Sequence, residues 1–117
     1  MQERRQLPRW RIGKSAQVKL GIEENPRAGH IEDMHLKGMC VSLPEALSQD
    51  QPVAMSVAIG NYLEFEIEAK VTWLKVQGER CIHGVSFNKI LDVDKEKIYG
   101  YISRYCSKQF KDRWWAT

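Results

Sequence analysis

The sequence predicts an all-β fold, a six-stranded antiparallel β-barrel with a C-terminal α-helix. Six short segments alternate apolar and polar residues, and turn residues such as Gly60-Asn61 and Gly78-Glu79 stand between them. After residue 92 the apolar period becomes that of a helix. A chain of 117 residues cannot leave six apolar strand faces in water. Closing the sheet removes its edges, and the helix can cover an open mouth or side.

The expected strands occupy residues 16–22, 30–35, 38–43, 53–59, 63–73 and 81–87. Asn25-Pro26 breaks the chain after the first strand, and residues 44–52 form a loop that can hold one helical turn at 45–47. The fifth strand has the clearest pattern, because six apolar residues alternate with polar ones: Leu63, Phe65, Ile67, Ala69, Val71 and Trp73. On this pattern Trp73 belongs to the core. His83 in the last strand shares a face with Val85 and Phe87, so it is expected in the core or at the barrel mouth.

The helix is expected to pack on the barrel through Ile98, Tyr101, Ile102 and Tyr105, which recur at i, i+3, i+4 and i+7. Asp92 is a plausible N-cap. Trp10 is expected to anchor the segment before the first strand onto the barrel. Three aromatic residues lie in the basic tail, where they either pack back on the barrel or remain available to a partner: Phe110, Trp114 and Trp115.

The charge is divided between the ends and the body of the chain. The net charge is +3, with +5 in residues 1–19 and +3 in residues 104–117, so the remaining residues carry −5. This division favours an anionic partner met by the ends and argues against a uniformly basic DNA-binding surface. No stretch approaches the roughly 20 apolar residues of a membrane helix, and the N-terminus is too charged for a signal peptide, so we expect a cytoplasmic protein.

The sequence contains no convincing catalytic set, so we expect a protein that is not an enzyme. GxSxG, HExxH and P-loop motifs are absent. His30 and His35 flank two carboxylates but project to opposite faces of a strand, so they cannot bind one metal ion together. Cys40, Cys81 and Cys106 lie far apart and are expected to be reduced thiols.

The N-terminal region contains an arginine cluster. We expect residues 1–14 to form a flexible basic arm, residues 15–110 the barrel and helix, and residues 111–117 a tail. The arm carries Arg4, Arg5 and Arg9, and Pro8 disfavours a helix there. An arginine donates two hydrogen bonds to guanine O6 and N7, stacks on bases and pairs with phosphate. The alternative is a basic arm that only meets solvent.

A second polar segment follows at residues 33–38. The Asp33 carboxylate can accept hydrogen bonds from a guanine edge. His35 lies two residues further on, so its side chain is on the same face of the strand as that of Asp33. Gly38 ends the turn, where a bare backbone permits a positive φ or the close approach of a ligand. The alternative is a tight β-turn with incidental polar residues.

Together these segments resemble the PilZ family, bacterial receptors for cyclic diguanylate (c-di-GMP). Arg5 to Arg9 matches the RxxxR motif in full, and residues 33–38 match the D/N-x-S-x-x-G motif at Asp33 and Gly38, with His35 in place of serine. Residues 71–73 and 84–87 look like the family's β-core. The resemblance covers residues 3–105 and implies the same barrel and helix.

The resemblance implies a c-di-GMP receptor that binds without a cofactor. Its ligand-binding residues are expected to be Arg4, Arg5, Arg9, Asp33, His35 and Gly38. The arginines would bind guanine edges and phosphates, Asp33 would accept from a guanine, and His35 would stack or donate. Ligand binding would order the arm and pass the signal to an effector protein of motility, pilus or exopolysaccharide machinery.

Two other functions remain open at this point. One is a PilZ-like adaptor that no longer binds nucleotide and acts through protein contacts. The other is a small β-barrel that binds RNA or single strands, which would combine a basic groove with exposed aromatics. The aromatics of the long strand fall on its apolar face, which disfavours this last function.

Overall fold

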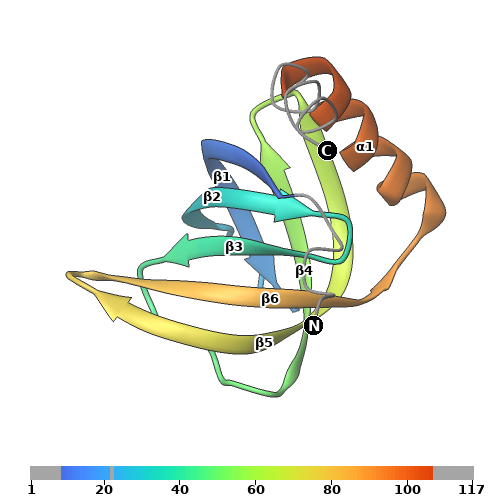
Figure 1. Ribbon diagram of the computed structural model, residues 1–117. Helices are drawn as coiled ribbons and strands as arrows, with labels where there is room; N and C mark the ends of the chain where they lie inside the picture. The colour runs from blue at the N-terminus through green and yellow to red at the C-terminus, as the bar shows by residue number, and fades with distance from the viewer. Residues whose placement is uncertain (1–8, 22, 107–117) are drawn as a thin grey trace, which may run out of the picture.

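The computed structural model describes residues 9–21 and 23–106 as a closed antiparallel barrel followed by one helix (Figure 1). The barrel order is β1-β2-β3-β6-β5-β4. The elements are β1 (Trp10–Leu20), β2 (Arg27–His35), β3 (Gly38–Leu43), β4 (Pro52–Ile59), β5 (Leu63–Gln77), β6 (Arg80–Ile90) and α1 (Asp92–Tyr105). The predicted fold class is therefore confirmed.

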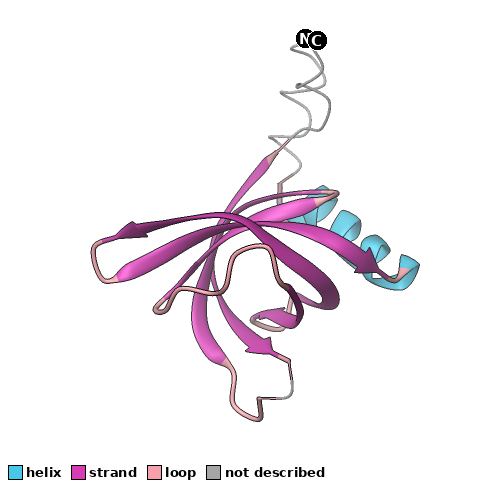
Figure 2. Cartoon of the chain, turned by 90° about the horizontal axis from the view of Figure 1, so that it is seen from below, coloured by secondary structure: helices cyan, strands magenta, loops and turns pink. Residues whose placement is uncertain are grey.

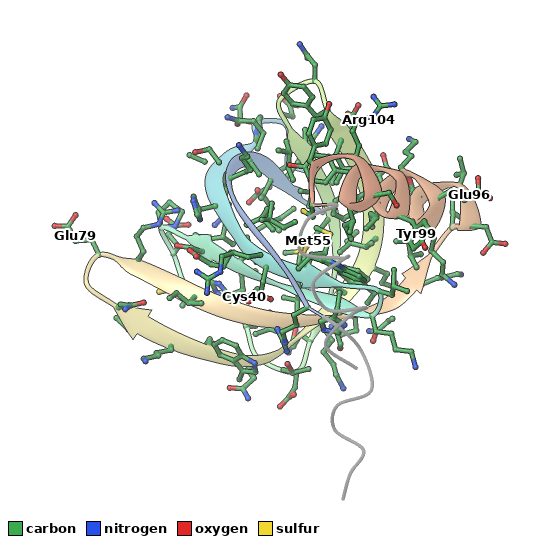
Figure 3. All side chains as sticks on the ribbon, turned by 45° about the horizontal axis from the view of Figure 1, so that its top comes forward. Cys40, Met55, Glu79, Glu96, Tyr99 and Arg104 are labelled. Atoms are coloured by element: carbon green, nitrogen blue, oxygen red, sulfur yellow. The ribbon has the colours of Figure 1, made fainter. Side chains whose placement is uncertain are left out.

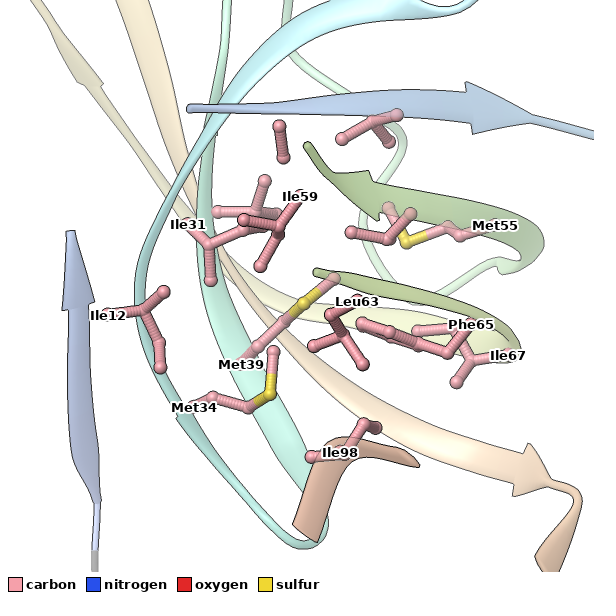
Figure 4. Packing of buried hydrophobic residues seen from close by; sticks show 14 of the residues in the cluster. Ile12, Ile31, Met34, Met39, Met55, Ile59, Leu63, Phe65, Ile67 and Ile98 are labelled. Carbon is pink, nitrogen blue, oxygen red and sulfur yellow. The ribbon is translucent and has the colours of Figure 1, made fainter. Parts of the chain in front are cut away.

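The inward-facing side chains of all six strands form one core (Figure 4). Met39, Met55 and Phe65 are among its fully buried members. The helix lies on one side of the barrel (Figure 2). It packs against β5 and adds Ile98, Tyr101 and Ile102 to the core. The predicted stripe is thus confirmed except at Tyr105, which is half exposed and packs edge-on against Tyr62.

The first strand begins at Trp10, earlier than the predicted residue 16. Its pairing with β2 shifts between Arg11 and Lys14, and Gly13 in this bulge has φ +59°. The extra residues interrupt the apolar alternation, which hides the first half of the strand. Residues 10–14 therefore belong to the barrel and not to the arm expected for residues 1–14. Trp10 is buried in the core, as its predicted anchoring role requires.

The prediction that Trp73 belongs to the core is wrong, because 45% of this side chain is exposed. In the β5–β6 ladder Val71 faces Val85, but Trp73 faces Gly84, so Thr72 is an extra residue on β5. This bulge turns Trp73 to the outer face, and Leu74 opposite His83 takes the inward position. The Thr72 hydroxyl donates to the carbonyl of Gly84 at 3.0 Å, which stabilises the bulge.

Two smaller expectations are wrong, and a third, the free cysteines, is confirmed. Asp92 is the first helical residue and not the N-cap, a position held by Leu91 without a side-chain cap. The 44–51 segment has no helical turn, and the Leu47 N–H donates to Nε2 of the fully buried His83 at 3.0 Å. Cys40, Cys81 and Cys106 are buried free thiols. No helix in the described ranges is long and apolar enough to cross a membrane.

Candidate functional site

The two segments singled out in the sequence meet at the edge of an outward-facing surface on the barrel. The strand registers define two neighbouring rows across β2, β3, β6 and β5. One row is Asp33, Cys40, Gly84 and Trp73, and the other is His35, Gly38, Ser86 and Lys70. The rows between and beside them point into the core, so these eight residues face outward. We call this surface the outer platform.

Small residues form the floor of the outer platform. Gly38, Cys40, Gly84 and Ser86 lie between Asp33 and His35 on one side and Trp73 and Lys70 on the other. The Trp73 indole lies directly over Gly84, where any added Cβ would overlap the ring. Gly38, Cys40 and Gly84 are themselves buried, because the His35 ring lies against Gly38 and the Trp73 indole lies over Gly84. The outer platform is therefore a face of small residues partly covered by an imidazole and an indole, with the Asp33 carboxylate at its edge.

Gly38 is required by packing within the barrel. A Cβ at this position would collide with the backbone carbonyl of Val85 and lie 3.1 Å from His35 Nε2. Its φ is not positive, so the left-handed backbone considered for Gly38 is not found. The neighbouring strand and the His35 ring are what exclude a side chain here.

An ion pair joins the arm to the second segment. Arg9 Nη1 donates to Asp33 Oδ1 at 2.8 Å. The side chains are 55% and 29% exposed, so a ligand can reach both of them. The structure therefore brings Arg9 and Asp33 together, whereas Arg4 and Arg5 lie outside the described residues.

His35 is held as a neutral ring. Its Nδ1 accepts a hydrogen bond from the Lys37 N–H at 3.1 Å, which places the proton on Nε2, beside Gly38. Burial lowers the pKa of His35, and the nearby Arg9 guanidinium adds to this effect, while Asp33 opposes it. At neutral pH the ring thus presents an N–H donor and an aromatic face.

The structure provides no metal site in the described part of the chain. His30 pairs with Glu32 at 3.0 Å, apart from His35. No group of three His, Cys, Asp or Glu side chains is arranged to hold an ion among these residues.

Trp73 is the site residue that sequence reasoning missed. The alternation in β5 places it in the core, and only the extra residue at Thr72 turns it outward. The sequence contains one signal of this, Gly84 in the interior of the last strand, since an interior strand glycine marks a close approach or a bulge.

The described chain is a small closed antiparallel β-barrel followed by one helix, and the outer platform is its candidate binding face. The PilZ domain family matches residues 3–104, and the chain therefore belongs to this family. PilZ domains are non-catalytic receptors that bind c-di-GMP, so the chain is classed with binding proteins and not with enzymes.

Solved structures share this fold. The isolated PilZ domain of Escherichia coli YcgR with c-di-GMP aligns with a TM-score of 0.67 at 15% identity, covering 93% of this chain and 98% of that domain. YcgR from Escherichia coli in complex with c-di-GMP aligns with a TM-score of 0.67 at 15% identity, and the alignment covers 94% of this chain and 50% of that one. The Bacillus subtilis inhibitor of motility MotI/DgrA aligns with a TM-score of 0.64 at 16% identity, and the alignment covers 94% of this chain and 53% of that one.

This chain thus spans about half the length of YcgR and MotI/DgrA. At these identities the likeness is one of fold. No curated protein matches the sequence significantly.

Proposed function

We propose that this chain is a c-di-GMP receptor that binds its ligand on the outer platform. The observation that carries the proposal is the Arg9–Asp33 ion pair, because it brings the two polar segments together beside a floor without large side chains. Family membership supports the choice of ligand. The basic arm supplies charge for the two phosphates of the nucleotide.

Each platform group has a role that fits its geometry. Asp33 accepts from the N1–H and N2–H₂ edge of a guanine, and this releases Arg9 toward a phosphate or a Hoogsteen edge. His35 donates through Nε2–H or stacks, and the exposed Trp73 indole offers a second stacking face. Gly38 lets the His35 ring lie close against the platform, where its N–H can face a bound base. Arg4 and Arg5 add contacts from the arm.

In this proposal the ligand exchanges one ion pair for several contacts. The arm is tied to the platform through Arg9, so replacing the Asp33 partner changes how the arm leaves the barrel. The rearranged arm then signals to a protein effector in the cytoplasm. A chain without nucleotide affinity would instead act as an adaptor through protein contacts alone.

Isothermal titration calorimetry with c-di-GMP tests the proposal. Asp33→Asn, Arg9→Ala and Trp73→Ala should each weaken binding by about 1–3 kcal/mol, the range for a base-edge contact or a stacked base. Arg104→Ala and Tyr62→Ala are matched controls, since both side chains are exposed and neither belongs to the outer platform. The controls should bind like the parent.

Two results would contradict this function. If the parent shows no heat with c-di-GMP at millimolar concentration, the adaptor function replaces it. If the parent binds but the three platform variants bind equally well, the ligand lies elsewhere on the chain.

A further inference from the structure

A second surface lies at the end of the barrel next to α1. A groove of about 980 Å³ runs between the β2–β3 turn, the end of β6 and the helix. Leu36, Phe87, Ile90 and Tyr99 line it, and Leu36 and Tyr99 are 40% and 48% exposed. Figure 3 shows Tyr99 and Glu96 on α1 above the end of β6. An open groove lined by four large apolar side chains is a feature of docking surfaces.

Gly100 gives the groove an unusual wall. It lies inside α1 and is exposed, and a Cβ built on it would meet nothing within 4 Å. Glycine inside a helix makes the helix less stable than alanine would. Since nothing in this chain would touch a side chain at position 100, packing within the chain does not require a glycine there. A missing side chain at this point allows the backbone of a docked segment to approach α1 closely.

The rim of the groove is basic. Lys37, Lys89 and Lys95 line it together with a single carboxylate, Glu96. Among the described residues none of these lysines forms an ion pair. The apolar floor and the lysine rim therefore suit an acidic segment with one apolar face.

We propose that this groove docks an acidic amphipathic helix of a partner protein, with its backbone crossing α1 at Gly100. Apolar residues at i, i+3, i+4 and i+7 would contact Leu36, Phe87 and Tyr99, and carboxylates would face the lysines. The chain's own C-terminal tail is a poorer occupant on charge grounds. Residues 107–117 carry two lysines and one arginine against a single aspartate, so they match the sign of the rim.

The groove shares two residues with the nucleotide site proposed above, and this part of the inference rests on that proposed function. Leu36 and Lys37 form the turn between His35 and Gly38, so they link platform to groove. The Phe87 N–H donates to the Lys37 carbonyl at 2.9 Å, which ties the turn to β6. A ligand that moves His35 therefore shifts Leu36 and Lys37 in the groove.

Synthetic peptides test the groove without nucleotide. The probe is a fluorescent peptide of about 16 residues with leucine at i, i+3, i+4 and i+7 and glutamate at most other positions. One comparison peptide has lysine for every glutamate, and another has serine for every leucine. Fluorescence anisotropy with the full chain should give at least tenfold tighter binding for the acidic amphipathic peptide than for either comparison.

Variants inside and outside the groove test whether the peptide binds there. Gly100→Gln should weaken peptide binding at least tenfold and leave the melting temperature unchanged or higher, whereas Arg104→Gln, exposed on the same helix but outside the groove lining, should change peptide affinity less than twofold. Lys89→Glu should weaken binding, and Lys75→Glu near the β5–β6 hairpin should not. That hairpin, marked by Glu79 in Figure 3, lies at the opposite end of the molecule from Tyr99.

Two results would overturn the docking proposal: equal affinity for the acidic and basic peptides, or parental affinity in Gly100→Gln. Repeating the titration with saturating c-di-GMP tests the shared turn separately. A shift in peptide affinity of threefold or more supports the link, and an unchanged affinity refutes the link alone. If the parent binds no c-di-GMP, the proposed function fails, but the nucleotide-free peptide result still decides the groove.

Discussion

Gly38 and Gly100 have opposite environments, although sequence alone presents them as the same residue. A Cβ on Gly38 would collide with the Val85 carbonyl, whereas a Cβ on Gly100 would meet open space. We expect Gly38→Ala to lower the free energy of unfolding by about 1–3 kcal/mol, the usual effect of overpacking. Gly100→Ala should raise it by about 1 kcal/mol, the difference in helix propensity.

Urea denaturation of the two variants measures both effects. An unchanged midpoint for Gly38→Ala would mean that β3 and β6 are less closely packed there than the structure shows. The contrast also guides tests of the platform. A Gly38 variant that loses nucleotide binding has first lost packing, so Asp33→Asn gives the cleaner result.

His35 is predicted to act as a neutral ring. Because its folded-state pKa is lowered, its contribution to stability is present above the unfolded value of about 6.5 and is lost as the pH falls below it. We therefore expect c-di-GMP affinity to change less than twofold between pH 8 and pH 6.5. Calorimetry at these two pH values measures it.

His35→Ser is the matched comparison for the histidine. If His35 contributes a contact, the serine variant binds no tighter than the parent at either pH. Tighter binding by serine would show that histidine obstructs the platform and would favour the adaptor function. A severalfold gain in parental affinity at the lower pH would mean that the imidazolium pairs with a phosphate.

Single residues could be predicted from the sequence where local pattern decides their environment. The segments of Arg9 and Asp33 could be expected to lie near one another, since a single strand and a turn separate them, but the ion pair itself was not predicted. Trp73 could not be predicted, since its orientation depends on one extra residue in the pairing of β5 with β6. A bulge reverses the side chain without changing the composition of the strand.

At the scale of elements, the apolar stripe of α1 holds the helix on the barrel. Ile102 is 1% exposed and belongs to the core. We expect Ile102→Ala to lower the free energy of unfolding by about 2–5 kcal/mol, the range for large-to-small core changes. Tyr99→Ala on the exposed side should change it by less than about 0.5 kcal/mol.

Thermal or urea unfolding followed by circular dichroism measures both helix variants. A loss below half a kcal/mol for Ile102→Ala would mean that the stripe does not carry the attachment of α1. The result also bears on the groove, because α1 forms one of its walls and must stay in place to bind a partner.

Element boundaries were predictable where alternation is regular. The third strand was predicted at the residues where β3 lies, and β4 differs by one residue at its start. The start of β1 was missed because Gly13 and its neighbours break the period. The conformation of the 44–51 segment could not be predicted from its own residues, because the Leu47 N–H is bound by His83, which is distant in sequence.

At the scale of the whole molecule, closure could be predicted and the outer platform could not. Six half-apolar strands in a short chain require a closed sheet, and this argument needs no knowledge of register. The platform needs the register of four strands, since its floor combines β3 with β6 and its borders come from β2 and β5. These pairings join residues that are far apart in sequence.

The pairing of β3 with β6 also determines the stage of folding at which the outer platform forms. It pairs Gly38–Leu43 with residues 81–86, so about a third of the chain must be enclosed before the floor is complete. Non-local pairings of this kind form late, after the entropy of closing a long loop has been overcome. A partly synthesised or partly unfolded chain thus has no face for the nucleotide. A ligand bound there would lower the unfolding rate of the closed barrel and leave its folding rate unchanged.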